Sequence, residues 1–116
     1  VEGDVPVYPI NPYGATKCWG EALARSYSHN YDLSCICVRI GAASFEQNGK
    51  WDAELPNMGF SAKDQANLFG CCVDAPDNIE FKIVNGVSKH QHSWMDLTCA
   101  KELGYQPQDG TAFPPE

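Results

Sequence analysis

An expected helix that leads almost directly into an expected strand is the feature that most constrains the fold of this 116-residue chain. Asn11 and Pro12 predict the start of the helix, because asparagine is a good N-cap and proline loses no hydrogen bond at the first helical position. Residues 33–41 form a short apolar run closed by Gly41, which predicts a buried strand. This order is typical of a parallel α/β sheet, whose ligands bind beyond the carboxyl ends of the strands.

The expected helix carries an apolar stripe as far as about Tyr31, because its apolar residues recur at steps of three and four. We expect this stripe to be buried. Another face of the helix carries Glu21 and Arg25, which are four residues apart and predict an ion pair. The residues of the stripe are Ala15, Cys18, Trp19, Ala22, Leu23 and Tyr27.

Tyr13 and Lys17 are the candidate catalytic residues, because a spacing of four puts a phenol and an ammonium roughly 6 Å apart on one helix face. A free tyrosine titrates near pH ~10, and acid/base work near neutral pH requires a shift equivalent to roughly 3 to 4 kcal/mol. One cation about 4 Å away contributes ~4 kcal/mol at an effective dielectric constant of ~20. The spacing also arises by chance in about one comparable sequence in four, so a surface tyrosine beside a solvated lysine is the alternative.

The segments around this pair resemble a known family, the extended short-chain dehydrogenase/reductases, which include nucleotide-sugar epimerases, dehydratases and sugar dehydrogenases. Within that family the pattern is similar to the uronate dehydrogenase-like branch. The resemblance implies an α/β fold: the C-terminal part of a Rossmann-like parallel sheet with a small substrate-side subdomain. The similar segments are residues 13–17 with Gly20 and Glu21 (the catalytic helix), 38–41 (the following strand), 61–64, 93–97, and 101–109 (the closing LGY-x-P signature).

The resemblance implies an oxidoreductase of sugars or nucleotide-sugars that uses NAD or NADP. Tyr13 would exchange a proton with a substrate hydroxyl while hydride moves to or from nicotinamide. Lys17 would favour the phenolate and bind the nicotinamide ribose. The backbone from Ile40 to Ala43 would line the nicotinamide pocket.

Two further residues are the expected substrate contacts. Ala42 stands where the uronate enzymes carry a substrate-contacting serine. Those enzymes also use a nearby arginine for the substrate carboxylate, whereas no arginine follows Gly41 here. Lys50 is the candidate replacement, as a point charge without the bidentate fork of a guanidinium.

The Gly-rich dinucleotide fingerprint of this family does not occur in the sequence. We therefore expect residues 1–116 to be the C-terminal catalytic and substrate half of an NAD(P)-binding domain, inactive alone, and able to associate, for example as a homodimer. Two alternatives remain open. One is a nucleotide-sugar epimerase or dehydratase that recycles a bound cofactor, and the other is a truncated, non-catalytic remnant that binds a partner through its sheet edge.

Charge and composition exclude several classes of protein. The net charge of −7 argues against nucleic-acid binding, which needs clustered lysine and arginine. No apolar run approaches the ~18 residues of a membrane span. The six cysteines predict buried, reduced thiols, a cytoplasmic location and no metal. The alternative for these residues is a zinc site built from Cys71, Cys72, His90 and His92.

We expect the rest of the chain to form the scaffold on the substrate side. Ser61 and Asp64 predict a helix start, and residues 80–85 alternate as a half-buried strand does. Residues 95–103 predict a final helix. Residues 46–60 predict a long loop, with Trp51 filling its core or stacking on a sugar, and residues 90–92 predict a solvated loop.

Overall fold

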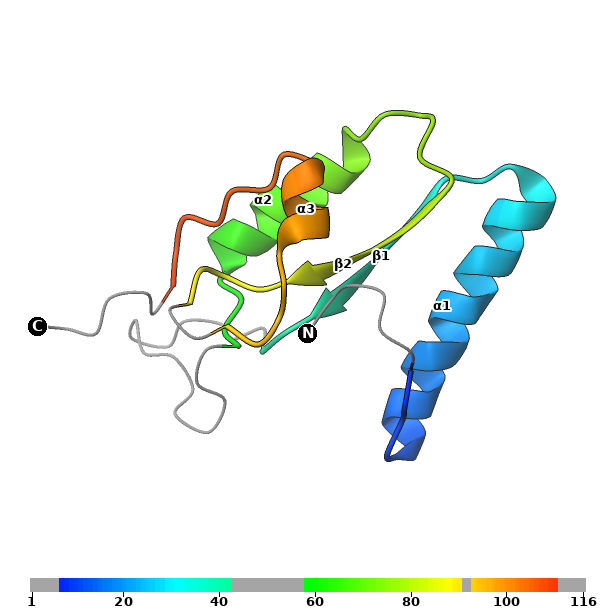
Figure 1. Cartoon of the computed structure of the whole chain (residues 1–116), viewed down its shortest axis with the longest axis horizontal. Coiled ribbons are helices and arrows are strands. Elements are labelled where there is room, and N and C mark those ends of the chain that lie inside the picture. Colours follow the sequence, from blue (N-terminus) through cyan, green and yellow to red (C-terminus); the bar gives the residue numbers. More distant parts are fainter. Residues whose placement is uncertain (1–6, 43–57, 91–92, 111–116) are drawn as a thin grey trace, which may run out of the picture.

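Figure 1 shows a computed structural model of the chain, which describes residues 7–42, 58–90 and 93–110. The strands β1 and β2 pair in parallel, with Cys35 opposite Phe81. The helices α2 and α3 lie on one side of this sheet, and α1 lies on the other. The expected α/β arrangement is confirmed. In chain order the elements are α1 (Pro12–Tyr31), β1 (Cys35–Ile40), α2 (Ala62–Val73), β2 (Phe81–Gly86) and α3 (Thr98–Glu102).

The helix α1 begins and ends close to where the sequence predicts. Asn11 is its N-cap, and the Asn11 Oδ1 accepts a hydrogen bond of 2.7 Å from the Gly14 N–H. Pro12 occupies the first helical position. At the other end Asp32 adopts the left-handed conformation, with φ of 53°, and stops the helix. The chain then enters β1 at Cys35, so the nearly loopless step is confirmed.

The predicted buried stripe on α1 is wrong. No residue of α1 is buried, and Trp19 and Tyr27 are 66% and 48% exposed. Periodicity located the apolar residues of the helix but could not tell which face meets the sheet. Small and polar residues occupy the half-buried face: Gly14, Cys18, Glu21, Ala24 and Ser28.

The core lies on the opposite side of the sheet, between the strands and the pair α2 and α3. Alternation along β1 turns Ile36 and Val38 toward this core. Gly86 permits the tight packing, because a Cβ there would lie 2.8 Å from Val38 Cγ1 and 3.0 Å from Phe60 Cε2. The fully buried apolar residues of the core are Phe60, Leu68, Val84, Ala100 and Tyr105.

The helix α2 starts as predicted, whereas α3 is shorter than predicted. The Ser61 hydroxyl accepts a hydrogen bond of 3.1 Å from the Asp64 N–H and caps α2. Residues 95–97 do not join α3, because local side-chain bonds compete with helix there. The Asp96 carboxylate accepts a hydrogen bond of 3.1 Å from the Thr98 N–H, and the bonds from Thr98 lower the pKa of Asp96.

The six cysteines are free and half-buried, so the prediction of free thiols is confirmed and that of full burial is wrong. His90 is only 8% exposed, and its Nε2 lies 2.9 Å from the Gly59 carbonyl oxygen, so the predicted solvated position is wrong. In the described parts of the chain no group of three metal-ligating side chains is present, and His92 and Trp51 lie outside those parts. None of the described helices is long and apolar enough to span a membrane.

Candidate active site

Tyr13 and Lys17 lie together on the first turns of α1. The Lys17 Nζ is 5.3 Å from the centroid of the Tyr13 ring, a cation–π contact that favours one mutual orientation. Both side chains are exposed, Tyr13 to 71%. Because Asn11 and Pro12 fix the start of the helix, the sequence places this pair at a capped helix end.

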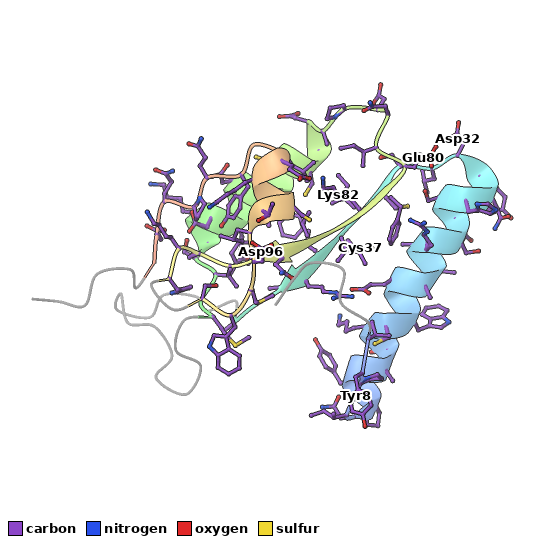
Figure 2. All side chains as sticks on the ribbon, in the orientation of Figure 1. Tyr8, Asp32, Cys37, Glu80, Lys82 and Asp96 are labelled. Carbon is purple, nitrogen blue, oxygen red and sulfur yellow. The ribbon has the colours of Figure 1, made fainter. Side chains whose placement is uncertain are left out.

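A cleft of about 560 Å³ separates α1 from β1. The cleft joins the Tyr13–Lys17 pair to the carboxyl end of β1, which is the edge where parallel α/β sheets bind their ligands. Figure 2 shows Cys37 on β1, on the side of the strand that faces α1. The lining residues are Tyr13, Lys17, Glu21, Cys37, Val38, Arg39, Ile40 and Gly41.

The structure describes two of the four other predicted cofactor and substrate contacts, Ile40 and Ala42. Ile40 is 50% exposed and lines the cleft. Ala42 has both backbone groups bonded within the protein, since its N–H donates to the Met58 carbonyl at 2.6 Å and its carbonyl accepts from the Phe60 N–H at 2.8 Å. Ala43 and Lys50 lie outside the described residues.

Gly41 serves a packing role that the sequence did not reveal. A Cβ at Gly41 would collide with the Met58 carbonyl oxygen and lie 2.6 Å from Val87 Cγ1. The backbone therefore approaches another part of the protein closely at this position. The backbone from Ile40 to Ala43 was expected to line the nicotinamide pocket, and Gly41 also lines the cleft.

Glu21 and Arg39 form a bidentate ion pair between α1 and β1. Arg39 Nε lies 2.7 Å from Glu21 Oε1, and Arg39 Nη2 lies 2.9 Å from Glu21 Oε2. The predicted pair of Glu21 with Arg25 is therefore wrong, and the Arg25 guanidinium instead lies 4.8 Å from the centroid of the Phe81 ring. The fork-to-fork contact across the cleft is stronger than an exposed i, i+4 pair.

Sequence reasoning missed this ion pair, although one signal was available. Arg39 interrupts an apolar strand, and a charged residue in a half-buried strand needs a partner. Alternation puts Arg39 on the same face of β1 as Cys37, toward α1. Burial and the charge of Glu21 raise the pKa of the Cys37 thiol, so the thiol is neutral in the cleft near neutral pH.

Comparison with known proteins finds one matching family model and several similar enzymes. Residues 1–49 match the sequence model of the NAD dependent epimerase/dehydratase family. The NAD-dependent glucose-6-phosphate dehydrogenase of Haloferax volcanii is 35% identical over 90% of the chain, which covers 39% of that enzyme. The uronate dehydrogenase of Agrobacterium fabrum is 33% identical over 91% of the chain, which covers 38% of that enzyme. Residues 1–49 therefore carry the sequence pattern of this family, and nearly the whole chain is similar to sugar dehydrogenases.

Solved structures of similar proteins agree with this similarity. A glucuronic acid dehydrogenase from Chromohalobacter salexigens matches 96% of the chain with a TM-score of 0.82 and 32% identity, over 40% of its own length. A uronate dehydrogenase from Agrobacterium tumefaciens matches 100% of the chain with a TM-score of 0.83 and 30% identity, over 46% of its own length. The expected part of a Rossmann-like sheet is thereby confirmed. The chain spans about 39% of the length of its curated relatives.

Proposed function

We propose that the protein containing this chain is an NAD-dependent oxidoreductase of sugars. Tyr13 exchanges a proton with a substrate hydroxyl, and hydride passes between the substrate and nicotinamide. The observation that carries this proposal is the position of Tyr13 and Lys17 on one wall of a cleft whose other wall is the carboxyl end of β1. The names of two relatives, an NAD-dependent glucose-6-phosphate dehydrogenase and a uronate dehydrogenase, support NAD and a sugar substrate.

The residues of the cleft fit the nicotinamide end of NAD, which when bound supplies the hydride acceptor. The Lys17 ammonium is a donor for ribose hydroxyls, and the half-exposed Ile40 at the end of β1 offers apolar surface for the ring. Ala43 and Lys50 are the further proposed contacts, with cofactor and substrate respectively, and Ala42 would contact the substrate through its methyl group.

The dinucleotide's pyrophosphate requires a different part of the protein. Enzymes with this fold bind it at a Gly-rich turn before a helix, and the 116 residues contain no such fingerprint. The chain also covers only 39% of the glucose-6-phosphate dehydrogenase. We therefore infer that residues 1–116 are the catalytic and substrate half of a Rossmann-like domain, and that the cofactor-binding half lies outside them.

Replacement of Tyr13 tests the proposal in the full-length protein. Tyr13→Phe removes the proton-transferring hydroxyl, so kcat for NAD reduction should fall by about 100-fold or more, while NAD affinity changes little. The measurements are NADH formation with a sugar substrate and NAD titration by protein fluorescence.

Tyr27→Phe is the matched control, because Tyr27 lies on the same helix but not on the cleft. This variant should keep the wild-type rate. Wild-type turnover in Tyr13→Phe would show that the assignment is wrong.

The family description favours a second candidate, an epimerase or dehydratase whose NAD stays bound and is recycled. The same Tyr13 and Lys17 would serve such a reaction. Net accumulation of NADH with a sugar substrate separates the two, because a dehydrogenase releases NADH and an epimerase does not.

A further inference from the structure

The ion pair between Glu21 and Arg39 joins the two walls of the cleft, because Glu21 lies on α1 with Tyr13 and Lys17 and Arg39 lies on β1. Its two side chains are 20% and 22% exposed, and both hydrogen bonds of the fork are shorter than 3 Å. A bidentate pair fixes a distance and also the orientation of the guanidinium plane, which a single contact does not. The pair therefore constrains how α1 is oriented against β1.

Polar contacts join α1 to the rest of the protein at two points along its length. Within the described residues no side chain of the helix is fully buried, and its half-buried face consists of small and polar residues. Near its C-terminal end the Ser28 hydroxyl donates a hydrogen bond of 2.6 Å to the Glu80 carbonyl, and Figure 2 shows Glu80 and Asp32 close together at this end. Tyr13, Lys17 and Glu21 follow at steps of four, so they lie along one ridge.

The length of the helix makes its tilt important for catalysis. At 1.5 Å per residue, Tyr13 lies about 22 Å along the axis from the contact at Ser28. A rotation of ~3° about that contact moves Tyr13 by roughly 1 Å, and a displacement of this size at a catalytic group can lower the rate about 100-fold. Glu21 lies roughly midway between the two residues, where a contact opposes this rotation.

We propose that Glu21, acting through Arg39, sets the tilt of α1 and thereby the distance between the Tyr13 phenol and the nicotinamide beyond β1. Both are positioning residues, since neither transfers the proton or the hydride. The inference rests on the proposed function, because it assumes that Tyr13 is the acid/base. It adds a second requirement for catalysis, the correct tilt of α1, to the spacing of Tyr13 and Lys17.

The first test is Glu21→Gln in the full-length protein, which keeps the shape of the side chain and removes its charge. We expect kcat for sugar oxidation to fall about 10- to 100-fold, because Tyr13 is displaced, with KM for the sugar changed less than about 3-fold. The second test is Arg39→Lys, which keeps the charge and removes the fork. It should lower kcat similarly, whereas a role for charge alone would leave it at the wild-type value.

The pH–rate profile separates positioning from a general loss of stability. As Tyr13 moves away from the positively charged nicotinamide, its phenolate is less favoured, so the pH of half-maximal kcat in Glu21→Gln should rise. A smaller folded fraction would lower kcat equally at every pH. Removal of the Glu21 charge without movement would shift the profile the other way, to lower pH, because the phenolate loses a neighbouring anion.

Glu102→Gln is the matched control, because it removes the same charge from an ion pair with Lys82, away from the cleft. This variant should keep the wild-type kcat and pH profile. Thermal unfolding of every variant identifies one that fails to fold, in which case the milder Arg39→Lys decides the question.

Failure of the inference is distinguishable from failure of the proposed function. If Tyr13→Phe loses turnover while Glu21→Gln and Arg39→Lys keep the wild-type kcat, the positioning role is wrong and the proposed function stands. If kcat falls with no rise in the pH of half-maximal rate, the pair has only a structural role. If Tyr13→Phe keeps its turnover, the proposed function is wrong and the positioning role with it.

Discussion

Cys37 shows how a single side chain acquires its chemistry from its neighbours. The residue lines the cleft between α1 and β1, opposite the helix that carries Tyr13 and Lys17. Burial is the main cause that raises the pKa of its thiol, and the carboxylate of Glu21 adds to the effect, while Arg39 opposes it. The thiol therefore stays protonated to a higher pH than free cysteine does.

This pKa gives a direct prediction for chemical labelling. Because the thiolate is the reacting form, iodoacetamide should alkylate Cys37 more slowly than free cysteine at equal pH, and the rate should rise only at higher pH. Mass-spectrometric peptide mapping across a pH series measures this rate in the full-length protein, with Cys37→Ser as the control. A rate that rises at lower pH than that of free cysteine would contradict the raised pKa.

At the scale of elements, the two ends of α1 differ in backbone conformation. Asn11 caps the first turn with its side chain, whereas Asp32 ends the helix in the left-handed region, with φ of 53°. That region is unfavourable for side chains other than glycine and, to a lesser degree, asparagine and aspartate. The end of the helix therefore carries some backbone strain.

Asp32→Gly should relieve this strain. We expect the free energy of unfolding to rise by roughly 0.5 to 1 kcal/mol, which thermal or urea unfolding of the full-length protein can measure. Asp74→Gly is the matched control, because Asp74 follows α2 with φ of −87°, where glycine offers no conformational advantage. An equal gain from both variants would show that the left-handed conformation is not the cause.

The ends of the elements were predictable because their causes are local. The Asn11 and Ser61 caps depend on bonds that span three residues, so the sequence carries the whole signal. Contacts between elements were not predictable in this way. The partner of Glu21 is Arg39 on the neighbouring strand, and only the packing of α1 against β1 places the two together.

The candidate site was likewise predictable where its cause is local and not where it depends on contacts between elements. Helix geometry was enough to place Tyr13 beside Lys17, whereas the cleft that they share with β1 depends on tertiary packing. The apolar spacing on α1 led to a wrong prediction of burial, because Trp19 and Tyr27 are exposed. The expected homodimer stays a prediction.

At the scale of the whole molecule, a buried carboxylate ties the C-terminal segment to α2. Asp64 is fully buried, and its Oδ1 and Oδ2 accept hydrogen bonds from the Gln108 and Asp109 N–H groups at 2.7 and 3.1 Å. The Tyr105 hydroxyl donates to the Val87 carbonyl at 2.7 Å, and burial raises the pKa of this phenol. Polar contacts thus hold the C-terminal segment to α2 and to the residue that follows β2.

Asp64→Asn should weaken the attachment of the C-terminal segment to α2. One amide oxygen cannot replace two carboxylate oxygens, and the new NH₂ group would face a backbone donor, so we expect a loss of about 2 to 3 kcal/mol. Hydrogen exchange at residues 108 and 109 of the full-length protein measures the effect locally. Asp77→Asn, at an exposed position, is the control, and equally slow exchange in both variants would contradict a role for Asp64 as the anchor.

The polar attachment of α1 to the sheet also bears on how related sequences can diverge. An apolar interface tolerates many exchanges at either partner, but the Glu21–Arg39 fork tolerates few unless both positions change together. Positions 21 and 39 should therefore covary among descendants of a common ancestor. A chimera that takes α1 from one relative and β1 from another would inherit two sound elements without the contact that aligns them.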